Sequence, residues 1–459
     1  MKHIVVIAVS LVVSVSQHAT AQDDPGFGAS GSTAESIERS EHIHQKPTGL
    51  FVTYEDGQKP GAEGQLMPTP TDRYPVVDQP VSTVPLFSED PAKPIQDAFE
   101  LIRKNLAEQA SLSFSPMAAW TFQNASEVVD GAPHARSTLW QAISMGLTLW
   151  DKDGDYGQVI FVLQNNIGFG TPLEPFMAAG VGDPSAVNNI LVGPDLTTNL
   201  YWQQSFNEDA VRLRVGKISD SAFFDRNAVA YDPIDGFMAL DFNQSLTNPF
   251  PSRGFGGVLS ADIGDEFTVR GGTMNSASTG TTKGFDGLGW AHLLTMVEGD
   301  LRVYPKISGK IREGHIRLMA WYNAIPNPTG TGNIGGMGLT LNMDQDIADH
   351  ATAFLRVGWG QNDVTVSNFA ISTGLAITAP FTLKSSQTGI AVEYAKITQL
   401  GRQSASLAIP AGDHYMLEWY WRVQMTDSTN TGPVIQVVRD VDAGIDHSVI
   451  FGWRTSIMF

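Results

Sequence analysis

Apolar and polar residues alternate along most of the chain after Ser111. In HYMLEWYWRVQMT, residues 414–426, every second residue from Tyr415 to Met425 is apolar or aromatic, and charged or polar residues occupy most positions between them. A period of two is typical of a β-strand with one apolar and one polar face. Similar stretches are REGHIRLMAWY, TAFLRVGWG, DAVRLRVGK, GIAVEYAK and QVIFVLQNN, separated by turn-forming clusters such as DKDGDYG and NPTGTGN. The pattern predicts an all-β fold.

The C-terminal stretch HSVIFGWRTSIMF, residues 447–459, indicates that these strands cross a membrane. Phe451, Trp453 and Phe459 share one alternating face, and the chain ends without a polar tail. In hydrocarbon the backbone has no water to bind, so strands can span it only in a closed ladder with apolar side chains toward lipid. Units of about 20 to 22 residues over residues 111–459 give about 16 to 18 strands. We therefore expect a transmembrane antiparallel β-barrel of 16 strands.

Three segments precede the predicted barrel. Residues 1–21 carry the apolar run IVVIAVSLVVSV and end in Ala-Thr-Ala, the pattern of a secretory signal peptide. Residues 22–90 are acidic, rich in Pro, Gly and Ser and without a period, which predicts a mostly extended, disordered tail. Residues 91–110 carry apolar side chains at helical spacing, which predicts a short amphipathic helix: Ile95, Phe99, Ile102 and Leu106.

Composition excludes several classes of function. The 459 residues carry a net charge of −19, which argues against a nucleic-acid partner, and no Cys, which excludes disulfides and thiolate metal sites. We find no G-x-S-x-G, H-E-x-x-H or phosphate-loop motif, and therefore expect no enzyme and no cofactor. DKDGDYGQVIFV begins like a calcium loop but has Tyr156 and Val162 where Gly and Glu are needed, and EHIHQ lies in the solvated tail. No metal site is expected.

Three blocks of the sequence resemble the carbohydrate-selective porin family of the OprB type. Residues 213–278 contain a strand ending in Gly-Lys, a Phe-Phe-Asp-x-Asn loop, an Asn-Pro-Phe-Pro stretch and a Gly-rich strand, while residues 351–377 and the closing strands are similar too. The resemblance extends from about residue 97 to 459, although the expected Gly-Asp-Trp-Gly-Gly opening is missing.

The resemblance implies a porin in the outer membrane of a Gram-negative bacterium through which mono- or disaccharides diffuse passively. It also implies contacts with outer-membrane lipid and lipopolysaccharide, and recognition of the strand ending in Phe459 by the barrel-assembly machinery. A monomer and a homotrimer remain equally open. The alternatives are a general or anion-preferring diffusion pore and a barrel that only anchors an outer-membrane enzyme or adhesin.

Charged and hydrogen-bonding side chains at a constriction decide which solutes pass a pore. Strand alternation, with the family blocks, gives these candidates for lining or narrowing the lumen: Arg212, Arg214, Lys217 just beyond a strand end, Arg317, Arg356, Glu393, Glu418, Tyr420 and Arg422, with Asp225 and Asn227 in a loop that could fold inward. The alternative is that the charges pair across the lumen and stiffen the barrel, and that the loop is only a packed turn.

Overall fold

The computed structural model describes most of the chain after Val84. The described residues are 85–152, 154–169, 180–183, 186–191, 196–251, 253–277, 284–285, 288–289, 292–326, 333–361, 364–404, 412–440 and 445–458. The expected signal peptide, nearly all of the expected tail and the terminal Phe459 lie outside these residues. No helix within the described ranges has the length and apolarity needed to cross a membrane.

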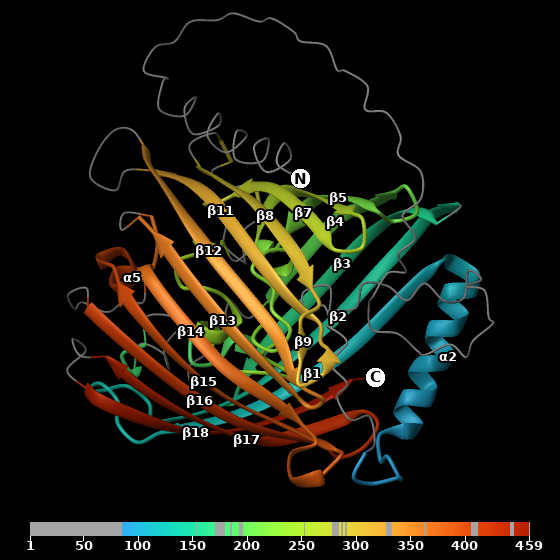
Figure 1. The fold of residues 1–459 in the computed structure, drawn as a ribbon. Coiled ribbons are helices and arrows are strands. Elements are labelled where there is room, and N and C mark those ends of the chain that lie inside the picture. Colours follow the sequence, from blue (N-terminus) through green and yellow to red (C-terminus); the bar gives the residue numbers. More distant parts are fainter. Residues whose placement is uncertain are drawn as a thin grey trace, which may run out of the picture.

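Sixteen antiparallel strands close into a barrel, as expected from the sequence (Figure 1). The ladder closes where the first strand pairs with the last, with Trp120 opposite Thr455. The barrel strands are β1 (Leu112–Ala125), β2 (Ala135–Lys152), β3 (Asp155–Gly168), β4 (Leu196–Phe206), β5 (Val211–Ile218), β6 (Gly254–Ile263), β7 (Phe267–Asn275), β8 (Leu293–Val303), β11 (Gly314–Pro326), β12 (Asn333–Ala348), β13 (Ala351–Gly360), β14 (Ser367–Thr378), β15 (Ser386–Ile397), β16 (Gly412–Gln424), β17 (Thr429–Asp440) and β18 (Ile445–Met458).

Several small elements lie before the first barrel strand or in the connections between strands. Strands β9 (Lys306–Ile307) and β10 (Lys310–Ile311) form a separate hairpin in the connection from β8 to β11. Helix α2 (Lys93–Ala110) precedes β1, and in Figure 1 it lies outside the barrel. The ring of Phe99 on this helix meets the ring of Phe114 on β1 edge-on, with centroids 5.7 Å apart. Two short helices, η2 (Asn189–Leu191) and η5 (Pro380–Thr382), and the helix α5 (Gln399–Ser404) lie in connections.

Alternation in the strands sorts side chains between the two faces of the barrel wall. On β16, Met416, Glu418 and Tyr420 are buried on the inner face, while the side chain of Tyr415 is 41% exposed on the outer face. The apolar and aromatic outer face suits contact with hydrocarbon, and the inner face collects the polar groups. Strand β16 therefore follows the predicted pattern.

The connection between β5 and β6, residues 219–253, folds into the lumen, and we call it the inner segment. It contains η3 (Asp220–Ala222) and α4 (Leu240–Asn243) and is seen inside the barrel in Figure 1. Its apolar side chains pack against three different parts of the wall. Phe224 belongs to a cluster with Trp321 on β11, Phe237 to one with Tyr420 on β16, and Tyr231 to one with Trp140 on β2. The main core of the protein thus lies inside the barrel.

Gly358 on β13 permits a close approach between the wall and the inner segment. A Cβ at this position would collide with the hydroxyl groups of Thr247 and Ser245. We expect Gly358→Ala to lower the free energy of unfolding by about 1–3 kcal/mol, as overpacked cores do, because the segment must move away from the wall. Urea unfolding of the refolded protein in detergent micelles measures this.

Gly271→Ala on β7 is the matched control, since the atom nearest to its new Cβ would be 4.0 Å away. A loss of stability in the control equal to that of Gly358→Ala would contradict the close-approach explanation.

Candidate functional site in the barrel lumen

The Phe-Phe-Asp-x-Asn motif anchors the inner segment to the wall. The Asp225 backbone has a left-handed conformation, with φ of 56°, which turns its carboxylate toward several donors. One oxygen of this carboxylate accepts hydrogen bonds from Arg356 at 2.9 Å and Asn342 at 2.8 Å, and the other accepts from the Ser245 backbone at 2.6 Å and from Asn248 at 2.9 Å. The loop therefore folds inward, and Asp225 is one of the groups that hold it there.

Asn227 holds the same turn through its side-chain amide. Its Nδ2 donates to Asn342 Oδ1 at 2.7 Å, and its Oδ1 accepts from the backbone N–H groups of Val229 and Ala230. Both the donor and the acceptor of the amide are thus used within the protein. Asp225 and Asn227 act here as positioning residues for the inner segment.

Arg356 on β13 binds the inner segment with most of its guanidinium group. Besides the bond to the Asp225 carboxylate, it donates to the carbonyl oxygens of Phe242 at 2.8 Å, Ala230 at 3.0 Å and Asp225 at 3.2 Å. The side chain is 1% exposed. A planar group with five donors can join several acceptors in one plane, which suits this role.

Three predicted residues on β16 lie under the inner segment. Glu418 accepts hydrogen bonds from the backbone N–H groups of Met238 at 2.5 Å and Ala239 at 2.9 Å, at the start of α4. Tyr420 meets the ring of Phe237 edge-on, with centroids 5.0 Å apart. Arg422 pairs with Asp235 and donates to Gln387 at 2.8 Å. These side chains face the lumen but are covered by the segment.

Arg454 on the last strand makes a similar contact that the sequence analysis did not identify. Its guanidinium donates to the carbonyl oxygens of Pro233 and Gly236 in the inner segment, at 2.9 Å for Gly236. The alternation in residues 447–459 places Arg454 on the face opposite Trp453, so the sequence does contain a signal for this residue. The side of the wall that includes β13, β16 and β18 therefore holds the segment in place.

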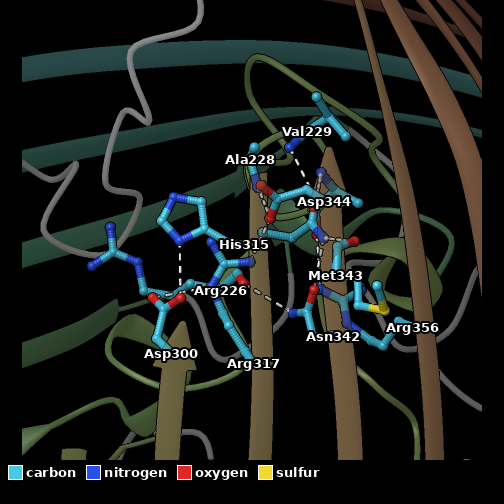
Figure 2. Close-up of polar contacts among 12 residues, drawn as sticks. Arg226, Ala228, Val229, Asp300, His315, Arg317, Asn342, Met343, Asp344 and Arg356 are labelled. Atoms are coloured by element: carbon cyan, nitrogen blue, oxygen red, sulfur yellow. Dashed lines mark hydrogen bonds and ion pairs between the residues drawn. The ribbon is translucent and has the colours of Figure 1, made fainter. Parts of the chain in front are cut away.

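A second group of charges lies on the neighbouring strands β8, β11 and β12 (Figure 2). Arg317 bridges two carboxylates, Asp300 at 3.3 Å and Asp344. His315 Nδ1 lies 2.9 Å from the second oxygen of Asp300. Arg317 is thus one member of an inner-face network in which positive and negative charges are paired.

Arg270 and Glu298 extend this network toward β7. They are register partners on β7 and β8 and form an ion pair of 2.8 Å, and Glu298 also accepts the backbone N–H of Asp225 at 2.7 Å. The sequence analysis did not identify these residues or Asp300 and Asp344. The signal was present in LLTMVEGDLRV, residues 293–303, where Glu298 and Asp300 alternate with apolar neighbours.

The inward charges on β5 and β7 keep more contact with solvent than those under the inner segment. The side chain of Arg212 is 25% exposed and pairs with Asp209 at 2.8 Å. Arg214 is half-buried, donates to Gln203 at 2.7 Å and lies 4.8 Å from the centre of the Phe223 ring. On β7, the side chain of Arg270 is 17% exposed.

Lys217 occupies a different place from the one expected. It lies within β5 and not beyond its end, and its register partner is Leu200, which is 53% exposed. Alternation therefore puts Lys217 on the outer face of the wall. The Gly-Lys pair looked like a strand end, but Gly216 adopts a φ of 151° and the strand continues to Ile218.

Asp232 gives the inner segment a dependence on pH. Desolvation in the lumen, with repulsion from Asp235, raises the pKa of the Asp232 carboxyl from 3.8 to about 7. The folded protein then binds more protons than the unfolded chain in the interval between these values, so the free energy of unfolding falls as pH rises through it. We expect Asp232→Asn to flatten this decline. Urea unfolding at a series of pH values measures it, and identical slopes for both proteins would contradict the assignment.

The lumen offers a surface suited to neutral, hydroxyl-rich solutes. Its guanidinium groups are donors and its carboxylates are acceptors, and most are paired, so the surface has little excess of one charge. A sugar hydroxyl can donate and accept at such a surface, whereas an anion finds several of the cations already next to a carboxylate. Carboxylate partners are present, although not across an open lumen as in the alternative prediction. Arg212 pairs with the adjoining turn, Arg317 with a neighbouring strand, and Arg356 and Arg422 with the inner segment.

Comparisons with known proteins found one family model and several solved structures. A model of the carbohydrate-selective porin, OprB family matches residues 156–459. The high-pH structure of Pseudomonas putida OprB superposes with a TM-score of 0.61 at 15% identity and covers 78% of this chain and 96% of that chain. The low-pH structure gives 0.46 at 11% identity, with 79% and 96% covered. A mutant of Rh. blastica porin gives 0.46 at 12% identity, with 76% and 100% covered. No curated protein sequence matches the chain.

Proposed function

Because the chain belongs to the OprB family of carbohydrate-selective porins, through whose barrels sugars diffuse passively, we propose that small sugars pass through the part of the lumen that the inner segment leaves open, beside the inward charges of β5 and β7. The exposure of these charges carries this proposal. Arg212 and Arg270 keep 25% and 17% of their side chains exposed, whereas Arg356 on β13 keeps 1%. A solute in the lumen can therefore reach the first two side chains more readily than the third.

The residues then divide into two roles. Arg212, Arg214 and Arg270 line the passage and exchange hydrogen bonds with sugar hydroxyls. Asp225, Asn227, Arg356, Glu418 and Arg422 position the inner segment, which sets the width of the passage. Tyr420 packs against Phe237 and is therefore not proposed to stack on a sugar.

The location and partners belong to the same proposal. The family and the fold imply the outer membrane, and they point to a channel and not to an enzyme. Outward aromatic side chains such as Tyr415, Phe451 and Trp453 are 37–46% exposed and suit the boundary between lipid and water. We infer that the chain contacts outer-membrane lipid and lipopolysaccharide, that its last strand is read by the barrel-assembly machinery, and that the barrel has no catalytic activity of its own.

Single-channel conductance in a planar bilayer tests the function. We expect discrete open steps that glucose or maltose reduces in a saturable manner, and a weaker effect of the anion gluconate. Steps that no neutral sugar changes would overturn sugar selectivity and leave a general pore. A bilayer without steps would favour the barrel as an anchor for another activity.

Arg214→Gln tests the passage itself. Arg214 is half-buried, and its hydrogen-bond partner Gln203 is neutral, so its loss leaves no carboxylate uncompensated. We expect the sugar concentration for half-maximal block to rise about tenfold, equivalent to one lost hydrogen bond to a charged group. Arg439→Gln on the outer face is the matched control, because Arg439 is exposed beside Tyr415. Equal effects of the two changes would rule out a direct role for Arg214.

A further inference from the structure

A buried group of acidic side chains and one histidine lies where two inward-folded connections meet the wall. Asp183 comes from the connection between β3 and β4, Asp241 from α4 in the inner segment, and His414 from β16. All three side chains are fully buried, and one potential ligand atom from each lies within 4.8 Å of the other two. His414 Nε2 is 2.9 Å from an Asp241 oxygen.

Glu393 on β15 supplies a second and independent observation. The residue is 4% exposed, and neither oxygen of its carboxylate has a hydrogen-bond partner among the described residues. Its neighbour Ala395 is the register partner of His414, so Glu393 is a diagonal neighbour of His414 on the same face, within reach of a long side chain. Asp241 and Asp183 act on it electrostatically. An unpartnered buried carboxylate therefore lies beside the group.

Several carboxylates lie near one another in a desolvated place. Their mutual repulsion is costly there unless a cation offsets it. Arg356 is a positive side chain that acts on Glu393, and its N–H groups bind Asp225 and the carbonyls of the inner segment. A cation held between Asp183 and Asp241 would reduce the repulsion among the carboxylates.

We propose that Asp183, Asp241 and His414 bind one divalent transition-metal ion that joins both inward connections to the wall, with the Glu393 carboxylate beside the site. Imidazole nitrogen with carboxylate oxygens is a ligand set that suits Zn²⁺ and Mn²⁺, and a set without imidazole would suit Ca²⁺ or Mg²⁺. Ligand atoms about 2.0–2.2 Å from Zn²⁺ lie at most about 4.4 Å from each other. The observed spacing of 4.8 Å requires only a small contraction. The ion would act as a cross-link that fixes the position of the inner segment.

Zn²⁺ titration of the refolded, EDTA-treated mature protein by calorimetry tests the proposal. We expect one Zn²⁺ per chain above the weak background of His42 and His44 in the tail, and at least about tenfold weaker binding in Asp241→Asn and in Asp183→Asn. Two variants are used so that one still reports if the other fails to fold. Asp349→Asn, at an exposed turn, is the control and keeps the affinity of the unmodified protein.

A second measurement identifies the ligands. Co²⁺ in place of Zn²⁺ gives a visible absorption spectrum that depends on its ligands, so His414→Gln should change the spectrum through loss of the nitrogen. Binding that neither carboxylate variant weakens, or no binding above the tail background, would overturn the proposal and leave protons as the compensating charge. Since the assay measures metal and not sugar, its result is independent of the proposed passage.

Discussion

Arg356→Met is expected to destabilise the barrel and to raise its conductance at the same time. The change removes the bonds to the Asp225 carboxylate and to the carbonyls of Phe242 and Ala230, all in one buried place. Breaking a buried ion pair by removing one partner costs about 3–5 kcal/mol, because the remaining charge is left uncompensated. The inner segment then loses its hydrogen bonds to Arg356 on β13, and the passage that it narrows becomes wider.

Two measurements follow the effects of Arg356→Met separately. Urea unfolding in micelles gives the loss of stability, and single-channel recording gives the larger conductance. Lys310→Met is the control, since Lys310 pairs with Asp349 in an exposed turn and such pairs contribute about 0–1 kcal/mol. If conductance stayed unchanged while stability fell, Arg356 would contribute to the stability of the barrel and would not determine the width of the pore.

Phe237→Ala should have an effect of similar size through packing alone. The ring of Phe237 is fully buried, and its centroid lies 5.0 Å from Tyr420, 5.3 Å from Phe242 and 5.8 Å from Phe354. Removing a buried aromatic ring costs about 3–5 kcal/mol, because the cavity left behind collapses only in part. We expect the inner segment to become less well held, with larger current fluctuations in the open state.

Phe381→Ala provides the control for Phe237→Ala. Phe381 lies in the turn between β14 and β15 and is 88% exposed, so its loss should change stability by no more than about 0.5 kcal/mol. The same unfolding and single-channel measurements apply. A loss in Phe237→Ala no larger than in the control would show that the aromatic cluster does not secure the segment.

The sequence predicts the barrel well because each of its long strands repeats one simple pattern. On β16 the alternation has no interruption, and both its faces are as expected. The prediction is wrong for Lys217, because Gly216 lies within β5 and does not end the strand. The Gly-Lys pair alone does not show whether a strand ends at the glycine or continues past it.

Alternation also cannot tell an inward residue that meets water from one that is covered. Arg214 and Arg356 show the same pattern in sequence, yet one remains half-buried and the other is enclosed by the inner segment. The Glu418 carboxylate accepts hydrogen bonds from backbone N–H groups. Every residue except proline has such a group, so the sequence does not indicate which ones Glu418 will bind. The roles of Arg356 and Glu418 depend on contacts with residues 114 to 180 positions away, which the alternation within one strand cannot indicate.

The origin of the contacts that hold the inner segment has a consequence for how the chain folds. The segment lies in the middle of the chain, but Arg454, which binds its Pro233 and Gly236 carbonyls, is on the strand that completes the ladder with β1. Contacts between distant positions form late, because the entropy of closing the loop must be overcome first. Barrel closure and narrowing of the passage would thus be completed by the same strand. A chain truncated before β18 should therefore lack both the pairing of β1 with β18 and the contacts of Arg454 with the inner segment. Without that pairing the barrel stays open, so an incompletely folded chain would not form a wide, unselective pore.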